Sequence, residues 1–164
     1  MQDYISLFIS TVNNELLTNI SKALDSDIIF GIALLTAMLI GERRREKIKK
    51  IIFAFVLAFI ISAAAKEIFK INRPCINEFA RIDCPNSYAF PSTHAALSFT
   101  LAIAFLNKRS YPAYLLFAVF VSFTRIYLTV HSLVDVGGGI AVAGISYYIT
   151  DLLIKNGEKQ GFSK

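Results

Sequence analysis

Five long apolar runs constrain this 164-residue chain more strongly than any other feature. They cover residues 28–40, 51–65, 95–106, 113–123 and 136–149. Each run can be extended toward the roughly 20 residues that a membrane-spanning helix needs. The mean hydropathy of +0.54 and the hydrophobic content of 55% are too high for an ordinary soluble domain. We therefore predict an all-α, polytopic membrane bundle of about five transmembrane helices.

The N-terminal segment has a different pattern. Between residues 4 and 24, apolar side chains recur at helical spacing, but Asn13, Asn14 and Glu15 interrupt them. This predicts one amphipathic helix in the membrane interface, with a helix packed into a soluble core as the alternative. No basic segment precedes the apolar residues, so we expect no cleaved signal peptide. We predict a single membrane domain, 1–164, made of an interfacial helix (1–26), a transmembrane bundle (27–154) and a cytoplasmic tail (155–164).

Basic residues give the chain a net charge of +5 and predict its orientation. They gather within 43–50, at Lys108 and Arg109, and in the tail at Lys155, Lys159 and Lys164. Because cytoplasmic connections carry an excess of lysine and arginine, these segments are expected in the cytoplasm. This distribution explains the charge better than nucleic-acid binding does. The connections 67–92 and 127–133 are then expected on the extracytoplasmic face of the cell membrane.

Two cysteines, Cys75 and Cys84, lie in the same outward connection. An oxidising exterior permits a disulfide between them, and two free thiols are the alternative. Neither of the two histidines neighbours a cysteine, and no spacing is typical of a metal site. We therefore expect no metal centre and no cofactor.

The first of three polar clusters at the ends of the apolar runs contains Lys66 and Arg73. It reads KEIFKINRP, and Pro74 is expected to follow the end of a helix. A lysine point charge and a forked guanidinium are complementary ways to hold phosphate oxygens. Taken alone, the cluster favours the alternative that Lys66 snorkels and Arg73 anchors the chain at the membrane surface.

The second cluster, Pro91 to His94, immediately precedes an apolar run. Ser92 or Thr93 is expected to cap the helix that begins there, and for an isolated motif capping alone is the simpler interpretation. The first turn of a helix also presents unpaired N–H groups and a positive dipole end, so it can hold an anion. An imidazole beside such a site, that of His94, can protonate the oxygen of a departing group.

The third cluster, TRIYLTVHSLVD, contains Arg125, His131 and Asp135. If the last two share a helix face at i and i+4, Asp135 can accept a hydrogen bond from one imidazole nitrogen. The other nitrogen is then free to attack phosphorus, with a purely structural His–Asp pair as the alternative. Lys66, Arg73 and Arg125 together can supply the charge neutralisation that Mg²⁺ provides elsewhere, which predicts metal-independent chemistry.

In chain order, Lys-x6-Arg-Pro, Pro-Ser-x-His and Arg-x5-His-x3-Asp resemble the signature of the type 2 phosphatidic acid phosphatase superfamily, in its membrane branch. The signature spans residues 66–135, and the apolar runs extend the resemblance over most of the chain. It implies a helical bundle with a phosphate pocket at the membrane surface. Thr93 stands where the family usually has glycine, and Thr124 where it usually has serine. The β-branched Thr93 is expected to reshape the pocket slightly.

The resemblance implies a role for each matching residue and a two-step displacement through a phosphohistidine. His131 is the expected nucleophile, Asp135 orients and polarises it, and His94 protonates the leaving group and then activates water. The phosphoryl oxygens are expected to be bound by Lys66, Arg73, Ser92, Thr93 and Arg125.

These features predict a membrane hydrolase that removes a terminal phosphate from a lipid phosphate or diphosphate. The outward site favours polyprenyl diphosphate, the substrate class of the undecaprenyl pyrophosphate phosphatases in this family. Alternatives are a phosphatidylglycerophosphate or phosphatidic acid phosphatase, a lipid phosphotransferase and a non-catalytic lipid-binding membrane protein. The soluble haloperoxidase branch is disfavoured by the apolar helices. The sequence leaves the oligomeric state open.

Glycines 137–139 follow Asp135 directly at the start of the last apolar run. Together with Ala143 and Gly144 they predict a face on which neighbouring helices approach closely. We assign this face no chemical role.

Overall fold

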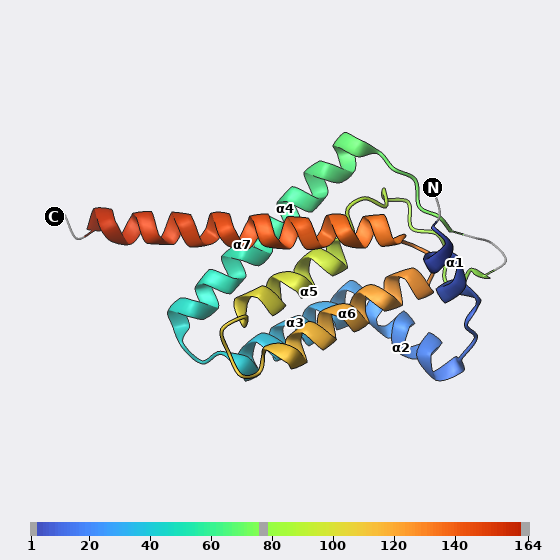
Figure 1. Ribbon diagram of the computed structural model, residues 1–164, viewed down its shortest axis with the longest axis horizontal. Helices are drawn as coiled ribbons and strands as arrows, with labels where there is room; N and C mark the ends of the chain where they lie inside the picture. Colours follow the sequence, from blue (N-terminus) through green and yellow to red (C-terminus); the bar gives the residue numbers. More distant parts are fainter. Residues whose placement is uncertain (1–2, 76–78, 162–164) are drawn as a thin grey trace.

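The computed structural model describes residues 3–75 and 79–161, with side chains described through residue 156. The described residues form seven α-helices and no strand, which confirms the predicted all-α fold. The helices are α1 (Tyr4–Thr11), α2 (Glu15–Asp25), α3 (Asp27–Gly41), α4 (Arg45–Phe69), α5 (Thr93–Ala104), α6 (Tyr111–Tyr127) and α7 (Leu133–Gly161) (Figure 1). The five apolar runs correspond, in order, to α3 through α7.

Helix α5 is the centre of the bundle (Figure 1). It packs against α4, α6 and α7, and α4 also packs against α7. Ala95, Ala96 and Ala102 are buried along α5, and their small side chains allow this close packing. At the far end of α5 the ring of Phe105 stacks on Tyr114 with the ring centroids 4.0 Å apart. The core therefore lies around α5, and the start of this helix is held on several sides.

Two helices, α4 and α7, are long and apolar enough to cross a membrane. The pair α2 and α3, bent by 86°, adds a third span if it is counted as one. Helices α5 and α6 are apolar but only 12 and 17 residues long. All five predicted apolar helices are therefore present. By length and composition, however, the described residues contain only two complete membrane spans, or three with the bent pair. Helix α7 continues through Gly161, so the segment predicted as a tail begins within a helix.

The N-terminal segment forms two helices where one was predicted. Helix α1 ends at Thr11 and α2 begins at Glu15. The side chain of Asn14 caps α2 by accepting a hydrogen bond from Leu17 N at 2.9 Å. The single-helix prediction was wrong because asparagine competes for backbone N–H groups and favours a cap over a helix interior.

The two N-terminal helices carry most of their large apolar side chains outward. Tyr4 and Phe8 are 92% and 71% exposed, while Ser6 and Ser10 on the same helix are buried. In α2, Ser21 is buried too. A helix packed into a soluble core would show the reverse distribution, so the soluble-core alternative is wrong. An outward apolar face is what a helix in a membrane interface presents to lipid.

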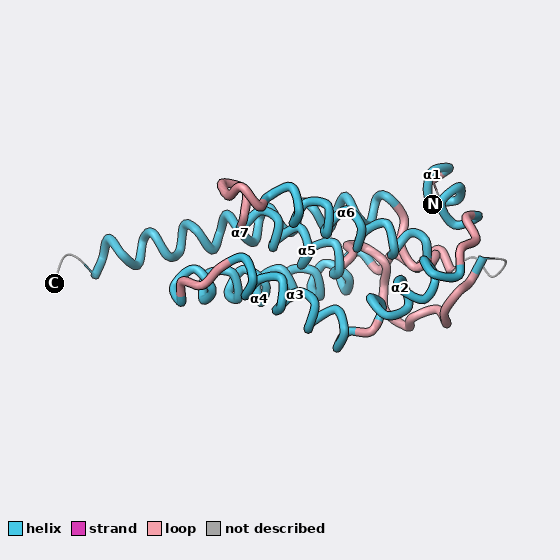
Figure 2. The backbone as a smooth tube through the Cα atoms, turned by 90° about the horizontal axis from the view of Figure 1, so that it is seen from below, coloured by secondary structure: helices cyan, strands magenta, loops and turns pink. Residues whose placement is uncertain are grey.

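The basic connections and the polar clusters lie at opposite ends of the bundle. Figure 2 shows the α3–α4 and α5–α6 connections at one end, and the long 70–92 connection with the α6–α7 turn at the other. At the first end, Lys108 Nζ donates to Glu42 Oε2 at 2.8 Å, and this hydrogen bond lowers the pKa of Glu42 to about 2. The separation of the two ends is what the predicted alternating topology requires.

Candidate active site

A pocket of about 650 Å³ lies at the end of the bundle that carries the long connection. Ser92 and Asp135 are buried close behind its wall. The other six predicted site residues line it: Lys66, Arg73, Thr93, His94, Arg125 and His131. Three clusters far apart in the sequence therefore meet around one cavity.

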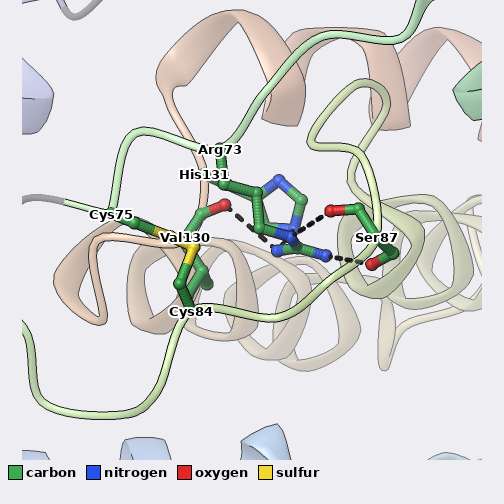
Figure 3. Close-up of a disulfide and its surroundings, with 6 residues drawn as sticks. All are labelled: Arg73, Cys75, Cys84, Ser87, Val130 and His131. Carbon is green, nitrogen blue, oxygen red and sulfur yellow. Dashed lines mark hydrogen bonds between the residues drawn. A yellow bond between two sulfur atoms is a disulfide. The ribbon is translucent and has the colours of Figure 1, made fainter.

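His131 lies in the turn between α6 and α7 and is almost completely buried. Burial lowers the pKa of His131, so the imidazole is neutral at neutral pH. Its Nε2 lies 3.1 Å from Arg73 Nη1 (Figure 3). A guanidinium can only donate, so Nε2 must carry the lone pair and Nδ1 the proton. Nε2 is therefore the nitrogen with an electron pair available for attack.

Asp135 lies on the Nδ1 side of His131. Its Oδ2 is 3.6 Å from Nδ1, beyond hydrogen-bond length, and Nδ1 has no hydrogen-bond partner among the described residues. Oδ2 accepts hydrogen bonds from Ser132 N at 2.7 Å and Ser132 Oγ at 3.1 Å. The shared helix face expected for this pair is wrong, because α7 begins at Leu133, after His131. The turn residue Ser132 instead sets the carboxylate beside the imidazole.

Arg73 is bound firmly to the pocket wall (Figure 3). Its Nε and Nη2 donate to the carbonyl and hydroxyl oxygens of Ser87, both at 2.8 Å, and Nη1 donates to Val130 O at 3.1 Å. Burial lowers the pKa of Arg73 to about 10, so the guanidinium stays charged at neutral pH. These contacts show that Arg73 is part of the site and not merely an anchor at the membrane surface.

The connection that carries Arg73 is closed by a disulfide between Cys75 and Cys84 (Figure 3). This answers the choice, open from the sequence, between a disulfide and two free thiols. Cys75 N also donates to Thr129 O at 2.9 Å. The disulfide constrains the connection itself, and the hydrogen bond joins it to the α6–α7 turn, which holds Arg73 beside His131.

Lys66, near the end of α4, reaches the same connection. Its Nζ donates to Tyr88 O at 2.6 Å and to Ala89 O at 3.3 Å. Ala89 N in turn donates to Ile71 O at 2.7 Å. The ammonium is therefore bound inside the protein, at the pocket, and does not snorkel toward lipid headgroups.

The first turn of α5 forms another wall of the pocket. Ser92 Oγ accepts a hydrogen bond from Ala95 N at 3.4 Å, as predicted for a cap. Ser92 N donates to Asp135 O at 2.9 Å, which joins the starts of α5 and α7. The ring of His94 lies 4.2 Å from that of Phe30 between centroids, and its buried Nε2 has no partner among the described residues. This imidazole is available to a bound substrate.

Two acidic residues of the pocket were missed from the sequence. Arg125 is only 3% exposed, and its Nη1 forms an ion pair with Asp25 Oδ1 at 2.6 Å. Asp27 lines the same pocket. The one available signal was two carboxylates directly before the first apolar run, where charge is expensive unless it has a partner.

Another part of the pocket wall is apolar. It consists of side chains from α3, α4 and α5, namely Phe30, Leu34, Phe59, Ala63 and Leu97, together with Gly31. The cavity thus combines cationic and apolar wall residues, which suit the headgroup and the chain of a phosphorylated lipid.

A family model of the PAP2 superfamily matches residues 47–156, which is more than half of the chain. The chain belongs to the PAP2 superfamily. The match includes all eight predicted site residues, from Lys66 to Asp135, and excludes α1, α2 and α3 with their two pocket carboxylates. The family expected from the three motifs is therefore confirmed.

Among curated relatives, this PAP2 chain is similar to sphingosine-1-phosphate phosphatase 2 of Mus musculus and of Homo sapiens. The identities are 30% and 29% over 114 residues, or 62% of this chain. The matched stretch is 32% of the mouse protein and 29% of the human protein. The chain thus spans about a third of the length of these relatives.

Two solved structures share the fold. Aquifex aeolicus LpxE superimposes with a TM-score of 0.71 at 24% identity, covering 89% of this chain and 92% of LpxE. The transmembrane PAP2 type phosphatidylglycerolphosphate phosphatase of Bacillus subtilis gives 0.69 at 19% identity, covering 93% and 83%. About nine tenths of the chain therefore shares its fold with these two membrane proteins.

Proposed function

We propose that this chain is a lipid phosphatase that forms a phosphohistidine on His131. The observation that carries the proposal is His131 Nε2, whose lone pair accepts from Arg73 at the wall of a pocket also lined by Lys66 and Arg125. The comparisons support phosphatase activity, since the two mammalian relatives and the Bacillus subtilis protein are phosphatases by name. A phosphoryl group that displaces Arg73 from Nε2 meets both a nucleophile and a cation.

In the first step, His131 Nε2 attacks phosphorus and forms an N–P bond while the P–O bond to the lipid breaks. His94, protonated when the phosphate anion binds beside it, donates this proton to the departing oxygen, so the lipid leaves as an alcohol, or as a monophosphate if it entered as a diphosphate. Asp135 stabilises the positive charge that develops on His131 through its Nδ1–H. Lys66, Arg73 and Arg125 neutralise the phosphoryl oxygens.

In the second step, His94 accepts a proton from water, and the water oxygen attacks phosphorus. The N–P bond breaks, and inorganic phosphate leaves with His131 neutral again. The three cations and the first turn of α5, with Ser92 and Thr93, bind the phosphoryl oxygens in both steps. The reaction as proposed needs no metal ion, because these side chains supply the positive charge.

The proposed substrate is a lipid phosphate or diphosphate, since the pocket wall combines cationic and apolar residues. Polyprenyl diphosphate remains the prediction from the sequence, with phosphatidylglycerophosphate and phosphatidic acid as alternatives. We also propose that the pocket opens on the extracytoplasmic face, since the basic connections are at the other end of the bundle.

The test is phosphate release by detergent-purified protein from polyprenyl diphosphate, phosphatidic acid and phosphatidylglycerophosphate in EDTA. We expect release by the wild type and none by His131→Ala. Lys49→Ala, which removes an exposed charge from α4 at the basic end, is the control and should keep full activity. Labelled substrate should leave acid-labile phosphate on the wild type alone. Turnover by folded His131→Ala would show that His131 is not the nucleophile.

A further inference from the structure

The pocket holds carboxylates as well as cations. Asp25 and Asp27 line it together with Lys66, Arg73 and Arg125. Three cations against two carboxylates leave one unit of positive charge in the lining. A pocket built only to hold as much phosphate as possible would exclude both carboxylates, because like charges repel strongly where water is scarce.

The position of Asp25 is unfavourable for the stability of α2. Asp25 is the last residue of α2, and a carboxylate at a helix C-terminus faces the negative end of the helix dipole. The ion pair with Arg125 Nη1 at 2.6 Å offsets this. Asp27, in contrast, lies in the first turn of α3, where a carboxylate is favourable. The contact with Arg125 therefore holds the Asp25 carboxylate at the pocket against the helix dipole.

The buried guanidinium of Arg125 is only partly satisfied. Its Nε and Nη1 are buried and have no hydrogen-bond partner among the described residues, since Nη1 approaches Asp25 only as an ion pair. The side chain is nearly inaccessible and lines the pocket. Such a group is ready for an additional acceptor. A phosphoryl oxygen that binds Arg125 would meet Asp25 directly, since the two residues are already in contact.

We propose that Asp25 is a specificity-determining residue that selects lipid phosphomonoesters carrying an ammonium or hydroxyl group beside the phosphate and disfavours lipid diphosphates. The inference rests on the proposed phosphatase function and narrows its substrate. The phosphate binds the cations, and the Asp25 carboxylate, aided by Asp27, accepts a hydrogen bond from the neighbouring donor. A second phosphate at that place would lie against two carboxylates. This runs against the polyprenyl diphosphate prediction.

The experiment compares kcat/KM of wild type and Asp25→Asn for three lipids. Sphingosine 1-phosphate carries an ammonium and a hydroxyl group near its phosphate, phosphatidic acid carries neither, and polyprenyl diphosphate adds a second phosphate. We expect the wild type to favour the first lipid. In Asp25→Asn its advantage over phosphatidic acid should fall about tenfold, because a charge-assisted hydrogen bond is weakened. The relative rate with the diphosphate should rise.

Two further variants keep the test decisive if Asp25→Asn folds poorly. Asp27→Asn, at an exposed position outside the ion pair with Arg125, should shift the selectivity in the same direction by a smaller factor. Asp83→Asn removes an exposed carboxylate from the 70–92 connection, away from this pocket, and should leave the ratio unchanged.

If the wild type releases phosphate but neither Asp25→Asn nor Asp27→Asn changes the selectivity ratio, the inference is overturned and the proposed function stands. An equal loss with all three lipids also overturns it, because that outcome marks a structural role. If the wild type releases phosphate from none of the lipids, the proposed function falls and this inference falls with it.

Discussion

His131 combines three properties that a nucleophilic imidazole needs: it is neutral, it is buried, and its Nε2 lone pair is directed toward a cation. Burial places its folded pKa below the unfolded value of 6.5, so above pH 6.5 the group is neutral in both states. As the pH falls below about 6.5, the unfolded chain takes up a proton that the folded chain does not, and stability is lost. Acidification below about pH 6.5 is therefore expected to lower the stability of the folded protein through His131.

Asp135→Asn tests how the imidazole is polarised. The amide cannot stabilise an imidazolium as a carboxylate does, so we expect kcat to fall by at least about 100-fold. KM should change little, because Asp135 lies behind the pocket wall. Steady-state kinetics separate the two constants.

The matched control for that variant is Ser132→Ala. It removes one of the two hydrogen bonds to Asp135 Oδ2 and leaves the one from Ser132 N. We expect a loss of kcat smaller than that of Asp135→Asn. A near-normal kcat in Asp135→Asn would show that the His–Asp pair has a structural role and no role in catalysis.

At the scale of helices, the site depends on the contact between the starts of α5 and α7. A Cβ on Gly139 would lie 2.7 Å from Ser92 O, and one on Gly138 would overlap the ring of Phe90. A Cβ on Gly137 or Gly144 would meet nothing within 4 Å. The predicted packing face is therefore confirmed at Gly139 and at the buried Ala143, while Gly138 faces a ring of the 70–92 connection and the prediction is wrong at 137 and 144.

Gly139→Ala should push α7 away from the first turn of α5, which carries Ser92, Thr93 and His94. We expect a loss of about 1–3 kcal/mol in stability, as for other overpacked sites. The rate should fall too, since the phosphate-binding turn moves. Thermal denaturation in detergent and kcat/KM measure the two effects.

Gly144→Ala is the matched control on the same helix. The added methyl group enters open space, and alanine favours a helix over glycine by roughly 0.5–1 kcal/mol. Stability should stay equal or rise, with activity unchanged. If Gly139→Ala behaved in the same way, the close approach of the two helices would not matter to the site.

The molecule as a whole is polarised along the bundle. The 70–92 connection is at one end, and the basic connections are at the other (Figure 2). The first end also carries the disulfide and the pocket, which is lined by Arg73, Pro85 and Ser87 of this connection. Exposed apolar side chains such as Ile32, Val56 and Phe59 cover the sides. Only a bilayer suits such a surface, and the active end then lies at one membrane face.

Removing the disulfide should loosen the active end selectively. For Cys75→Ser with Cys84→Ser we expect a stability loss of about 2–3 kcal/mol, from the greater freedom of the unfolded chain. KM should rise, because Arg73 lies two residues from Cys75. Thermal denaturation and kinetics with and without reductant provide the measurement.

Reductant also supplies the control for this double variant. It should reproduce the effect in the wild type and add nothing in the double variant. Unchanged kinetics in both proteins would mean that the contacts of Arg73 with Ser87 and Val130 position it without the disulfide.

The sequence by itself determined the helical membrane class, the family and the residues of the three motifs. Hydrophobic runs and the positions of cations are local properties of the sequence, and the residues of a motif can be identified without knowledge of the fold. Tertiary structure decided what depends on distant segments: the pairing of Asp25 with Arg125, and the close approach of Gly139 to the backbone of Ser92. Asp25 and Arg125 are 100 positions apart, and no local pattern can show that a bend between two helices brings a carboxylate onto a buried guanidinium.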